Sequence, residues 1–221
     1  MRAARSACTR RRRDRKRGPL AALGPARDDG QARLTLEIYL ARHGETEWSL
    51  SGQHTGITDL PLTPRGEKKA TALGRRLAGI HFDAVYSSPM QRAMRTAKLA
   101  GFDHPQITPL LKEVDYGRYE GLTSHQIHES DPNWELFNDG SPAGESPDQI
   151  YARAGDFIDL ATRHADASVL AFGHGHILRA VAVAWIRAGI RIASGLQLDV
   201  ATLSILSDGG RGRVIALWNA P

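Results

Sequence analysis

The sequence LTLEIYLARHGET, residues 34–46, decides the fold. Every second residue is apolar, the spacing typical of a β-strand, at Leu34, Leu36, Ile38 and Leu40. This predicted strand runs directly into Arg42 and His43. In open α/β sheets the ligand crevice lies outside the carboxyl ends of the strands. Arg42 and His43 are therefore candidates for a functional site.

Predicted strands and helices alternate along the rest of the chain. Further strands are expected at residues 83–87, 107–110, 168–172, 201–206 and 213–218. Helix starts are indicated at Thr63-Pro64, at Ser88-Pro89, at the capping-box pair Ser146 and Gln149, and after His176, with Gly101 ending the second helix. The last two strands are expected to form a hairpin through Asp208-Gly209-Gly210. The order predicts an α/β protein, a three-layer α/β/α sandwich around a mostly parallel sheet.

The positive charge of the chain is concentrated at its N-terminus. The first seventeen residues carry a net charge of +8, and because the whole chain carries +5, the remainder carries −3. A block of like charges without hydrophobic periodicity is typical of disorder. We expect residues 1–32 to be a disordered basic extension, whether a real tail, a targeting segment or a misplaced start, and residues 33–221 to be one domain. This mildly acidic domain is not expected to bind nucleic acid.

Cysteine usage and hydropathy limit the cellular setting. Cys8 is the single cysteine, so an internal disulfide is excluded and a reducing, cytoplasmic location is expected. No apolar run approaches the ~18 residues that a membrane span needs, so no membrane partner is expected. A homo-oligomer is compatible with the sequence.

Several residues that follow predicted strands suit phosphoryl transfer without a metal. A phosphate monoester needs cationic donors, preferably the planar fork of arginine, which Arg42 and Arg92 can supply. It also needs a nucleophile and an acid for the departing alkoxide, roles that fit His43 and Glu113. His174 can donate a hydrogen bond to the phosphate.

The Gly-His-Gly-His sequence at residues 173–176 raises the question of a metal site. No His-Glu-x-x-His motif and no acidic cluster accompanies it. We therefore predict no metal and no other cofactor.

Four motifs in order resemble the histidine phosphatase (phosphoglycerate mutase-like) superfamily. They are Leu40-Ala41-Arg42-His43-Gly44-Glu45-Thr46, Ser87-Ser88-Pro89-Met90-Gln91-Arg92-Ala93, Glu113-Val114-Asp115-Tyr116-Gly117-Arg118-Tyr119-Glu120-Gly121 and Gly173-His174-Gly175. The resemblance covers nearly all of residues 34–218 and implies a phosphoglycerate mutase-like fold. Within the superfamily the sequence looks most like the acid phosphatases and sugar-bisphosphatases.

The resemblance implies a role for each matched residue. His43 would form a phosphohistidine, Glu113 would protonate the leaving group and then activate water, and Arg42, Arg92 and His174 would hold the phosphate. The substrate-binding residues would be Thr55, Gly56, Tyr116 and Ser49. Ser49 departs from the pattern, because many members have asparagine there, and we expect an altered pocket shape rather than lost activity.

Three functions compete at this stage. The first is hydrolysis of a small phosphorylated metabolite, such as a sugar phosphate or a bisphosphate like sedoheptulose bisphosphate. The second is a phosphoglycerate mutase, and the third is a non-catalytic relative that binds phosphorylated partners. Glu113-Val114-Asp115-Tyr116-Gly117 looks like the phosphatase branch, whereas mutases tend to show Glu-Arg-His-Tyr-Gly. All the expected catalytic residues are present, so the first function is favoured.

Overall fold

The computed structural model describes residues 36–163, 168–209 and 212–221. Residues 1–32, which we predict to be a disordered extension, and the predicted boundary at residue 33 lie outside the described residues. Among the described residues, no helix is both long enough and apolar enough to cross a membrane.

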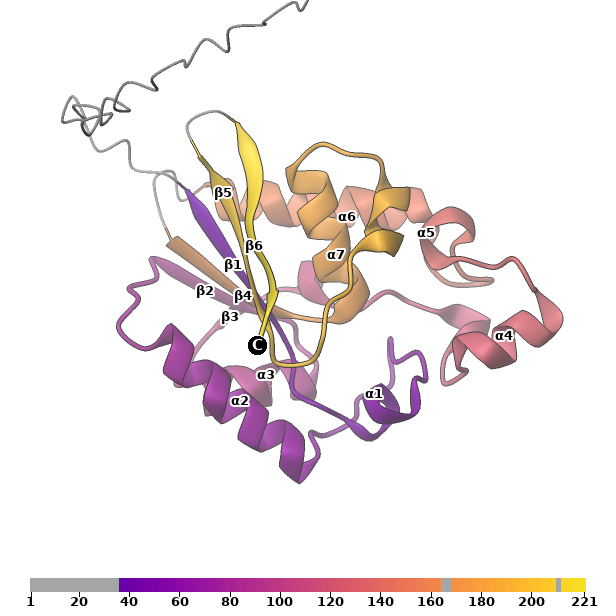
Figure 1. Ribbon diagram of the computed structural model, residues 1–221, viewed down its shortest axis with the longest axis horizontal. Coiled ribbons are helices and arrows are strands. Elements are labelled where there is room, and N and C mark those ends of the chain that lie inside the picture. The colour runs from indigo at the N-terminus through magenta and orange to yellow at the C-terminus, as the bar shows by residue number, and fades with distance from the viewer. Residues whose placement is uncertain (1–35, 164–167, 210–211) are drawn as a thin grey trace, which may run out of the picture. The chain divides into compact units, whose positions relative to one another are not determined.

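A mixed six-stranded sheet forms the centre of the folded unit (Figure 1). Its strands are β1 (Glu37–Arg42), β2 (Ala84–Ser87), β3 (Gln106–Ile107), β4 (Ser168–Gly173), β5 (Leu203–Asp208) and β6 (Arg213–Ala220). They lie in the order β3-β2-β4-β1-β5-β6. The pairs from β3 to β1 are parallel, and β5 and β6 pair antiparallel at the other edge. The three-layer α/β prediction with a mostly parallel sheet is confirmed.

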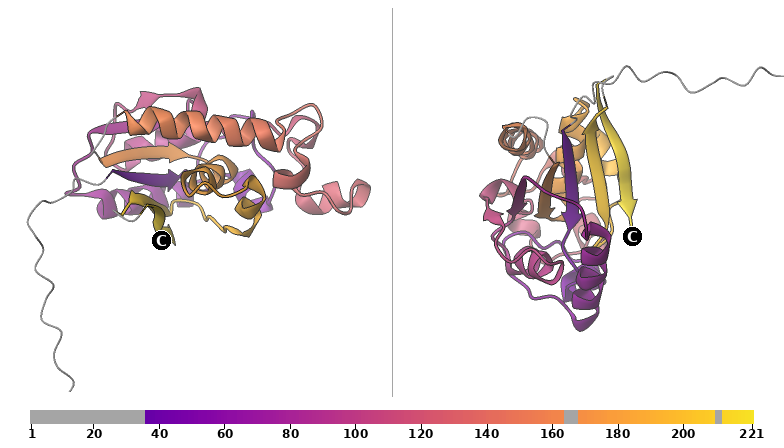
Figure 2. Two further views of the ribbon diagram at one scale, coloured as in Figure 1. Left: turned by 90° about the horizontal axis from the view of Figure 1, so that it is seen from above. Right: turned by 90° about the vertical axis from the view of Figure 1, so that its left-hand side faces the viewer.

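Helices cover both faces of the sheet. The α-helices are α1 (Glu47–Ser51), α2 (Pro64–Leu77), α3 (Gln91–Leu99), α4 (Ser124–Ser130), α5 (Leu136–Asp139), α6 (Pro147–Thr162) and α7 (Gly175–Trp185). Short 3₁₀ helices occur at η1 (Pro109–Leu111), η2 (Gly117–Tyr119) and η3 (Ile190–Gly195). Helices α2 and α3 pack on one face and α6 and α7 on the other (Figures 1 and 2). Helices α1, α4 and α5 lie beyond the carboxyl ends of β1 and β4.

The central strand β1 is buried on both faces, which explains its nearly continuous apolar sequence. Ile38 and Leu40 belong to the core shared with α6 and α7. Tyr39 and Ala41 belong to the smaller core shared with α2 and α3. At its carboxyl end, where the site is expected, the strand reaches polar surroundings with the half-buried Arg42.

Most of the predicted helix boundaries agree with the structure. Thr63 caps α2 through its side chain, and Ser146 and Gln149 form the capping box that begins α6. Gly101 follows the end of α3 with a φ of +97°. The predicted pairing of the last two strands is confirmed, although their turn lies partly outside the described residues.

Two local predictions were wrong. Ser88 does not cap α3, because the N-cap is Met90 and the Ser88 hydroxyl instead meets a histidine ring and the Met90 N–H. The strand expected at residues 107–110 is only two residues long and passes into η1. Pro109 lacks an N–H and suits the first position of that 3₁₀ helix better than a strand interior.

The capping box of α6 gives a direct test of the fold. Ser146 Oγ accepts from the Gln149 N–H at 3.3 Å, and Gln149 Oε1 accepts from the Ser146 N–H at 2.8 Å. Ser146→Ala should lower the free energy of unfolding by about 1 kcal/mol because a helix N–H loses its acceptor. Urea denaturation measures this. Thr71→Ala, at an exposed position inside α2, is the control, and an equal loss in both variants would contradict the prediction.

Candidate active site

The register of β1 against β4 brings the two predicted histidines together. Arg42 lies opposite Gly173 in this parallel pair, and the His43 N–H donates to the Gly173 carbonyl at 3.0 Å. The residues that follow, His43 and His174, therefore leave the sheet side by side. Their ring centroids are 5.0 Å apart.

The His43 ring is held in one tautomer. Its Nδ1 lies 2.6 Å from the Gly44 carbonyl oxygen, which can only accept, so Nδ1 carries the proton and Nε2 has a free lone pair. Burial, followed by the positive charges of Arg42 and Arg92, lowers the pKa of His43 from 6.5 to about 3. The neutral ring, with its Nε2 lone pair free, can therefore act as a nucleophile.

Arg92 and His174 form a buried pair directly behind His43. Arg92 Nε donates to His174 Nδ1 at 3.0 Å, so His174 carries its proton on Nε2, which lies 2.8 Å from the Ser88 hydroxyl. Burial and the Arg92 charge hold the pKa of His174 well below its usual range. Both side chains are fully buried, and neither lines the reaction cavity described below.

The remaining donors of Arg92 bind the loop between α1 and α2. Nη1 donates to the Thr58 carbonyl at 2.8 Å, and Nη2 donates to the carbonyls of Thr55 and Gly56 at 3.0 and 3.1 Å. Arg92 therefore ties this loop to His174.

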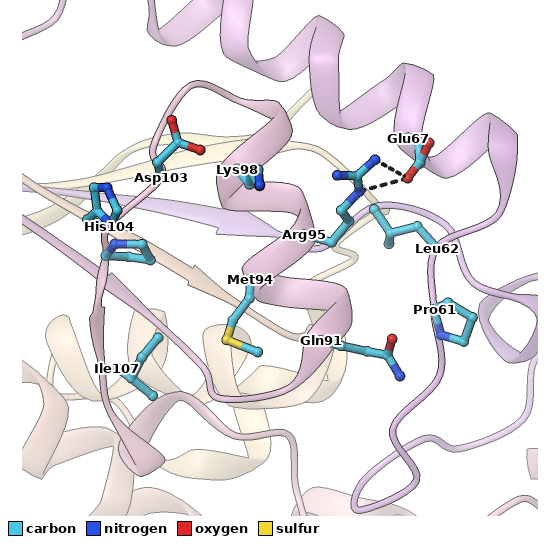
Figure 3. A pocket seen from close by; sticks show the side chains of 11 residues that line it. Pro61, Leu62, Glu67, Gln91, Met94, Arg95, Lys98, Asp103, His104 and Ile107 are labelled. Atoms are coloured by element: carbon cyan, nitrogen blue, oxygen red, sulfur yellow. Dashed lines mark hydrogen bonds and ion pairs between the residues drawn. The ribbon is translucent and has the colours of Figure 1, made fainter.

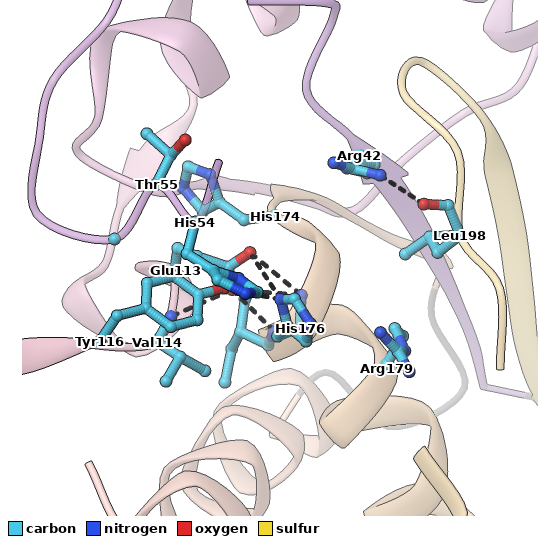
Figure 4. A network of polar contacts seen from close by, with 12 residues as sticks. Arg42, His54, Thr55, Glu113, Val114, Tyr116, His174, His176, Arg179 and Leu198 are labelled. Carbon is cyan, nitrogen blue, oxygen red and sulfur yellow. Dashed lines mark hydrogen bonds and ion pairs between the residues drawn. The ribbon is translucent and has the colours of Figure 1, made fainter. Parts of the chain in front are cut away.

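Arg42 faces the cavity with a free donor. One of its terminal nitrogens donates to the Leu198 carbonyl at 2.5 Å, whereas its buried Nε has no hydrogen-bond partner (Figure 4). A side chain at Gly175 would approach the guanidinium to 3.4 Å, so glycine there leaves Arg42 its space. The unpaired Nε–H is the kind of donor that an anion would satisfy.

Glu113 sits on the N-terminus of α7. Its carboxylate accepts from the N–H groups of Val114, His176 and Ile177 at 3.0 to 3.2 Å (Figure 4). Burial alone would raise the pKa of Glu113, but the hydrogen bonds from His176 and the nearby positive charge hold it well below its ordinary value. Carboxylates that accept several backbone N–H bonds favour the ionised form. Without ligand, Glu113 is an anion.

These groups meet in a cavity of about 150 Å³. It is lined by Arg42, His43, Trp48, Ser49, Gly52, Gln53, His54, Thr55, Glu113, Tyr116 and His176. Of the predicted substrate-binding residues, Ser49, Thr55 and Tyr116 do line it. The cavity thus brings together a neutral imidazole, an unpaired guanidinium donor and a carboxylate.

Ser49 has less freedom than its position suggests. Its hydroxyl donates to the Thr46 carbonyl at 2.8 Å and accepts from the Thr46 N–H at 2.8 Å, as part of the capping box of α1. The donor that we expected to face the substrate is therefore used within the helix. Ser49 shapes the cavity rather than pointing a free hydroxyl into it.

Gly56 does not line the cavity, contrary to expectation. Its N–H donates to the Glu120 carboxylate at 3.0 Å, and its carbonyl accepts from Arg92. A Cβ at this position would lie 2.3 Å from the Val114 carbonyl oxygen, so no side chain fits. Glu120 also accepts from the Thr58 N–H at 2.9 Å. Gly56 therefore anchors the loop that holds Arg92.

His54 and His176 line the cavity, although neither is among the catalytic or substrate-binding residues expected from the sequence. The Tyr116 hydroxyl lies 2.6 Å from His176 Nδ1, and the His54 ring lies 4.7 Å from the Tyr116 ring and 5.9 Å from the His176 ring. Burial, followed by the charge of His176, lowers the pKa of His54 to about 4. The sequence carries one signal for His176, because it stands two residues after His174 at the start of a helix. It carries none for His54, which lies in an irregular loop.

A larger hollow of about 660 Å³ lies along the outer side of α3 (Figure 3). Its walls include Met94, Arg95, Lys98 and Ile107, and an ion pair joins Arg95 to Glu67. None of the residues predicted to be catalytic lines it.

The described part of the chain contains no group of three or more His, Cys, Asp or Glu side chains arranged to hold a metal ion. The described residues of the cavity instead provide arginine as the cationic group.

Known proteins share this sequence and fold. The model of the histidine phosphatase superfamily (branch 1) matches residues 38–221. An acid phosphatase of Mycobacterium tuberculosis is 43% identical over 171 residues, which cover 76% of this chain and 83% of that protein. The sedoheptulose 1,7-bisphosphatase of Saccharomyces cerevisiae is 32% identical over 196 residues, covering 72% of this chain and 70% of that protein.

A solved structure agrees with these relatives. The product of an open reading frame of Mycobacterium tuberculosis superposes with a TM-score of 0.81 at 40% identity, covering 83% of this chain and 97% of that one. The chain is therefore an enzyme, like the phosphatases that it resembles, and it belongs to the histidine phosphatase superfamily, branch 1.

Proposed function

We propose that the protein is a metal-independent phosphomonoesterase that acts on a small phosphorylated metabolite through a phosphohistidine at His43. The observation that carries this proposal is the state of the His43 ring. It is neutral, its Nδ1 proton is held by the Gly44 carbonyl, and its Nε2 lone pair is free beside Arg42 and Glu113.

The reaction has two displacement steps. His43 Nε2 attacks phosphorus, the bond to the ester oxygen breaks, and the departing alkoxide takes a proton from Glu113. Glu113, now ionised, then takes a proton from water as that water attacks the phosphohistidine. Inorganic phosphate leaves, and both His43 and Glu113 return to their starting states.

The arginines supply the positive charge that the transferred group requires. Arg42 can donate its unpaired Nε–H to a phosphate oxygen. Arg92 adds its positive charge from behind the His43 ring, and its Nη2 would reach a phosphate oxygen only by releasing the carbonyls of Thr55 and Gly56. His174 keeps Arg92 in place through its Nδ1 and completes the group that holds the phosphate.

Glu113 must gain a proton before it can serve as the acid. Its contacts in the empty site hold its pKa low and favour the ionised form, but a phosphate dianion bound beside it would disfavour the charged carboxylate and raise that pKa. Substrate binding would therefore couple the arrival of the phosphate to protonation of the acid.

The relatives support the substrate class. The similar proteins are named acid phosphatase and sedoheptulose 1,7-bisphosphatase, so a sugar phosphate or sugar bisphosphate is the substrate class that we propose for this chain.

The role of His43 is tested by substitution and by trapping the phosphoenzyme. His43→Ala should abolish turnover, and the wild type should carry an acid-labile, alkali-stable phosphate on Nε2, assigned by NMR, because Nδ1 is occupied. Activity should persist in EDTA. His81→Ala, at an exposed histidine, is the control. Turnover by His43→Ala, or activity lost to EDTA and restored by a divalent ion, would overturn the mechanism.

The role of Glu113 is tested by pH and by the leaving group. We expect kcat to be highest on the acid side of neutral, because His43 stays neutral there and Glu113 in the complex loses its proton as the pH rises. Glu113→Gln should lower kcat by roughly 10²- to 10⁴-fold for sugar phosphates. The loss should be far smaller for p-nitrophenyl phosphate, whose leaving group hardly needs a proton.

Glu129→Gln, an exposed acid on α4, is the control for this variant. Equal losses of kcat on both substrates would remove Glu113 from the acid role.

Hydrolysis should prevail over mutase activity. A mutase must exclude water from its phosphohistidine. Here the polar segment at residues 123–147 is fixed beside the site, because Trp134 and Phe137 are buried in the main core, so it is not free to close over His43 as a sealed lid. A coupled enolase assay with 2,3-bisphosphoglycerate should detect little exchange between 3- and 2-phosphoglycerate relative to phosphate release. Mutase flux that exceeds phosphate release would refute this expectation.

A further inference from the structure

Two buried hydrogen-bond donors without partners lie near the active site. In the described part of the chain, the buried side-chain polar atoms without a partner are Arg42 Nε, Ser141 Oγ and Ser194 Oγ. Arg42 lines the reaction cavity, and Ser194 lines a second cavity of about 170 Å³. A buried donor left unpaired costs free energy unless a ligand satisfies it.

The second cavity adjoins the reaction cavity. Both are lined by His54 and His176, so the two spaces meet at these residues. Together the two spaces lie at the lower end of the roughly 300–1,000 Å³ typical of small-molecule sites. A substrate whose phosphate lies at His43 can therefore extend past these rings.

Arg179 is the charged group of the second cavity. It follows His176 by three residues on α7, so the two lie on the same helix face (Figure 4). Its Nε and Nη2 donate to the carbonyls of Ala193 and Ser194 at 2.8 and 2.9 Å, and its guanidinium lies 5.0 Å from the centre of the Phe137 ring. Nη1 forms no hydrogen bond with any residue that the structure describes.

The carboxylates of Glu113 and Glu135 act on the charge of Arg179 only from beyond ion-pair distance. Within the described residues Arg179 forms no ion pair, and its hydrogen-bond acceptors are neutral carbonyls. Glu135, the acid in the cavity wall, is exposed and its carboxylate accepts from the Asn138 amide. A half-buried guanidinium with a free Nη1 and a neighbouring free hydroxyl is suited to an anion.

We propose that the second cavity binds an anionic group, a phosphate or a carboxylate, at the far end of the substrate, with Arg179 Nη1 and the Ser194 hydroxyl as donors. This inference rests on the proposed function, since it concerns the part of the substrate that is not hydrolysed. It makes Arg179 a specificity-determining residue, selecting substrates that carry a second negative group.

The test compares substrates that differ only in this group. Fructose 1,6-bisphosphate is paired with fructose 6-phosphate for a distal phosphate, and O-phosphoserine with O-phosphoethanolamine for a distal carboxylate. The wild type should prefer the first member of at least one pair in kcat/KM. Arg179→Gln should reduce that preference roughly ten- to hundredfold, the range expected for a lost charge-assisted hydrogen bond.

Two further variants separate recognition from folding. Ser194→Ala keeps the Ser194 carbonyl that Arg179 binds, and it should reduce the same preference by a smaller factor. Arg191→Gln, an exposed arginine also in η3, should leave the preference unchanged. Hydrolysis of p-nitrophenyl phosphate, which has no distal anion, should stay within about threefold of the wild type in all three variants.

Each outcome has one meaning. If Arg179→Gln loses its preference only within the fructose pair, the cavity binds a phosphate. If it loses its preference only within the phosphoserine pair, the cavity binds a carboxylate. An unchanged preference in Arg179→Gln, or an equal loss on every substrate including p-nitrophenyl phosphate, would overturn the inference. Because it is a ratio between substrates, the preference can be measured even if His43 proves not to be the nucleophile.

Discussion

The parallel pairing of β1 with β4 is the constraint on which the site depends. Its register sets Arg42 opposite Gly173 and fixes His43 through a hydrogen bond to the Gly173 carbonyl. A slip of one residue would turn every side chain of β1 to the other face of the sheet. Because β1 is buried on both faces by different cores, such a slip is strongly disfavoured. The packing of the core thus determines the spacing of the two histidine rings.

The second determinant is the start of α7, which immediately follows β4. Its first N–H groups bind the Glu113 carboxylate, so the same strand end that places His174 also places the acid. The helix dipole and the N–H groups favour the anion, whereas a bound phosphate would favour the protonated form. Protonation of Glu113 would therefore weaken the same contacts that hold its carboxyl group in position.

The sequence could predict those residues whose positions follow from strand ends. His43, His174 and Arg92 follow β1, β4 and β2, and the strand pattern located them before any contact was known. Other roles depend on loops without periodicity. His54 faces the cavity because its backbone forms hydrogen bonds with Gly121 and Leu122. Gly56 does not line the cavity because its N–H is bound to the Glu120 carboxylate. Such long-range loop contacts leave no local pattern in the sequence.

The electrostatics of the site explain why these contacts are retained. Arg42 and Arg92 flank a histidine that they keep neutral, and the described residues of the cavity set only Glu113 against them. An arrangement of buried cations with an unpaired donor is unfavourable for folding by itself. It becomes favourable when an anion arrives, because the unpaired Arg42 Nε–H is already in place to donate to it. We propose that Arg179 extends the same principle to the neighbouring cavity, where its positive charge would select substrates that carry a second anionic group.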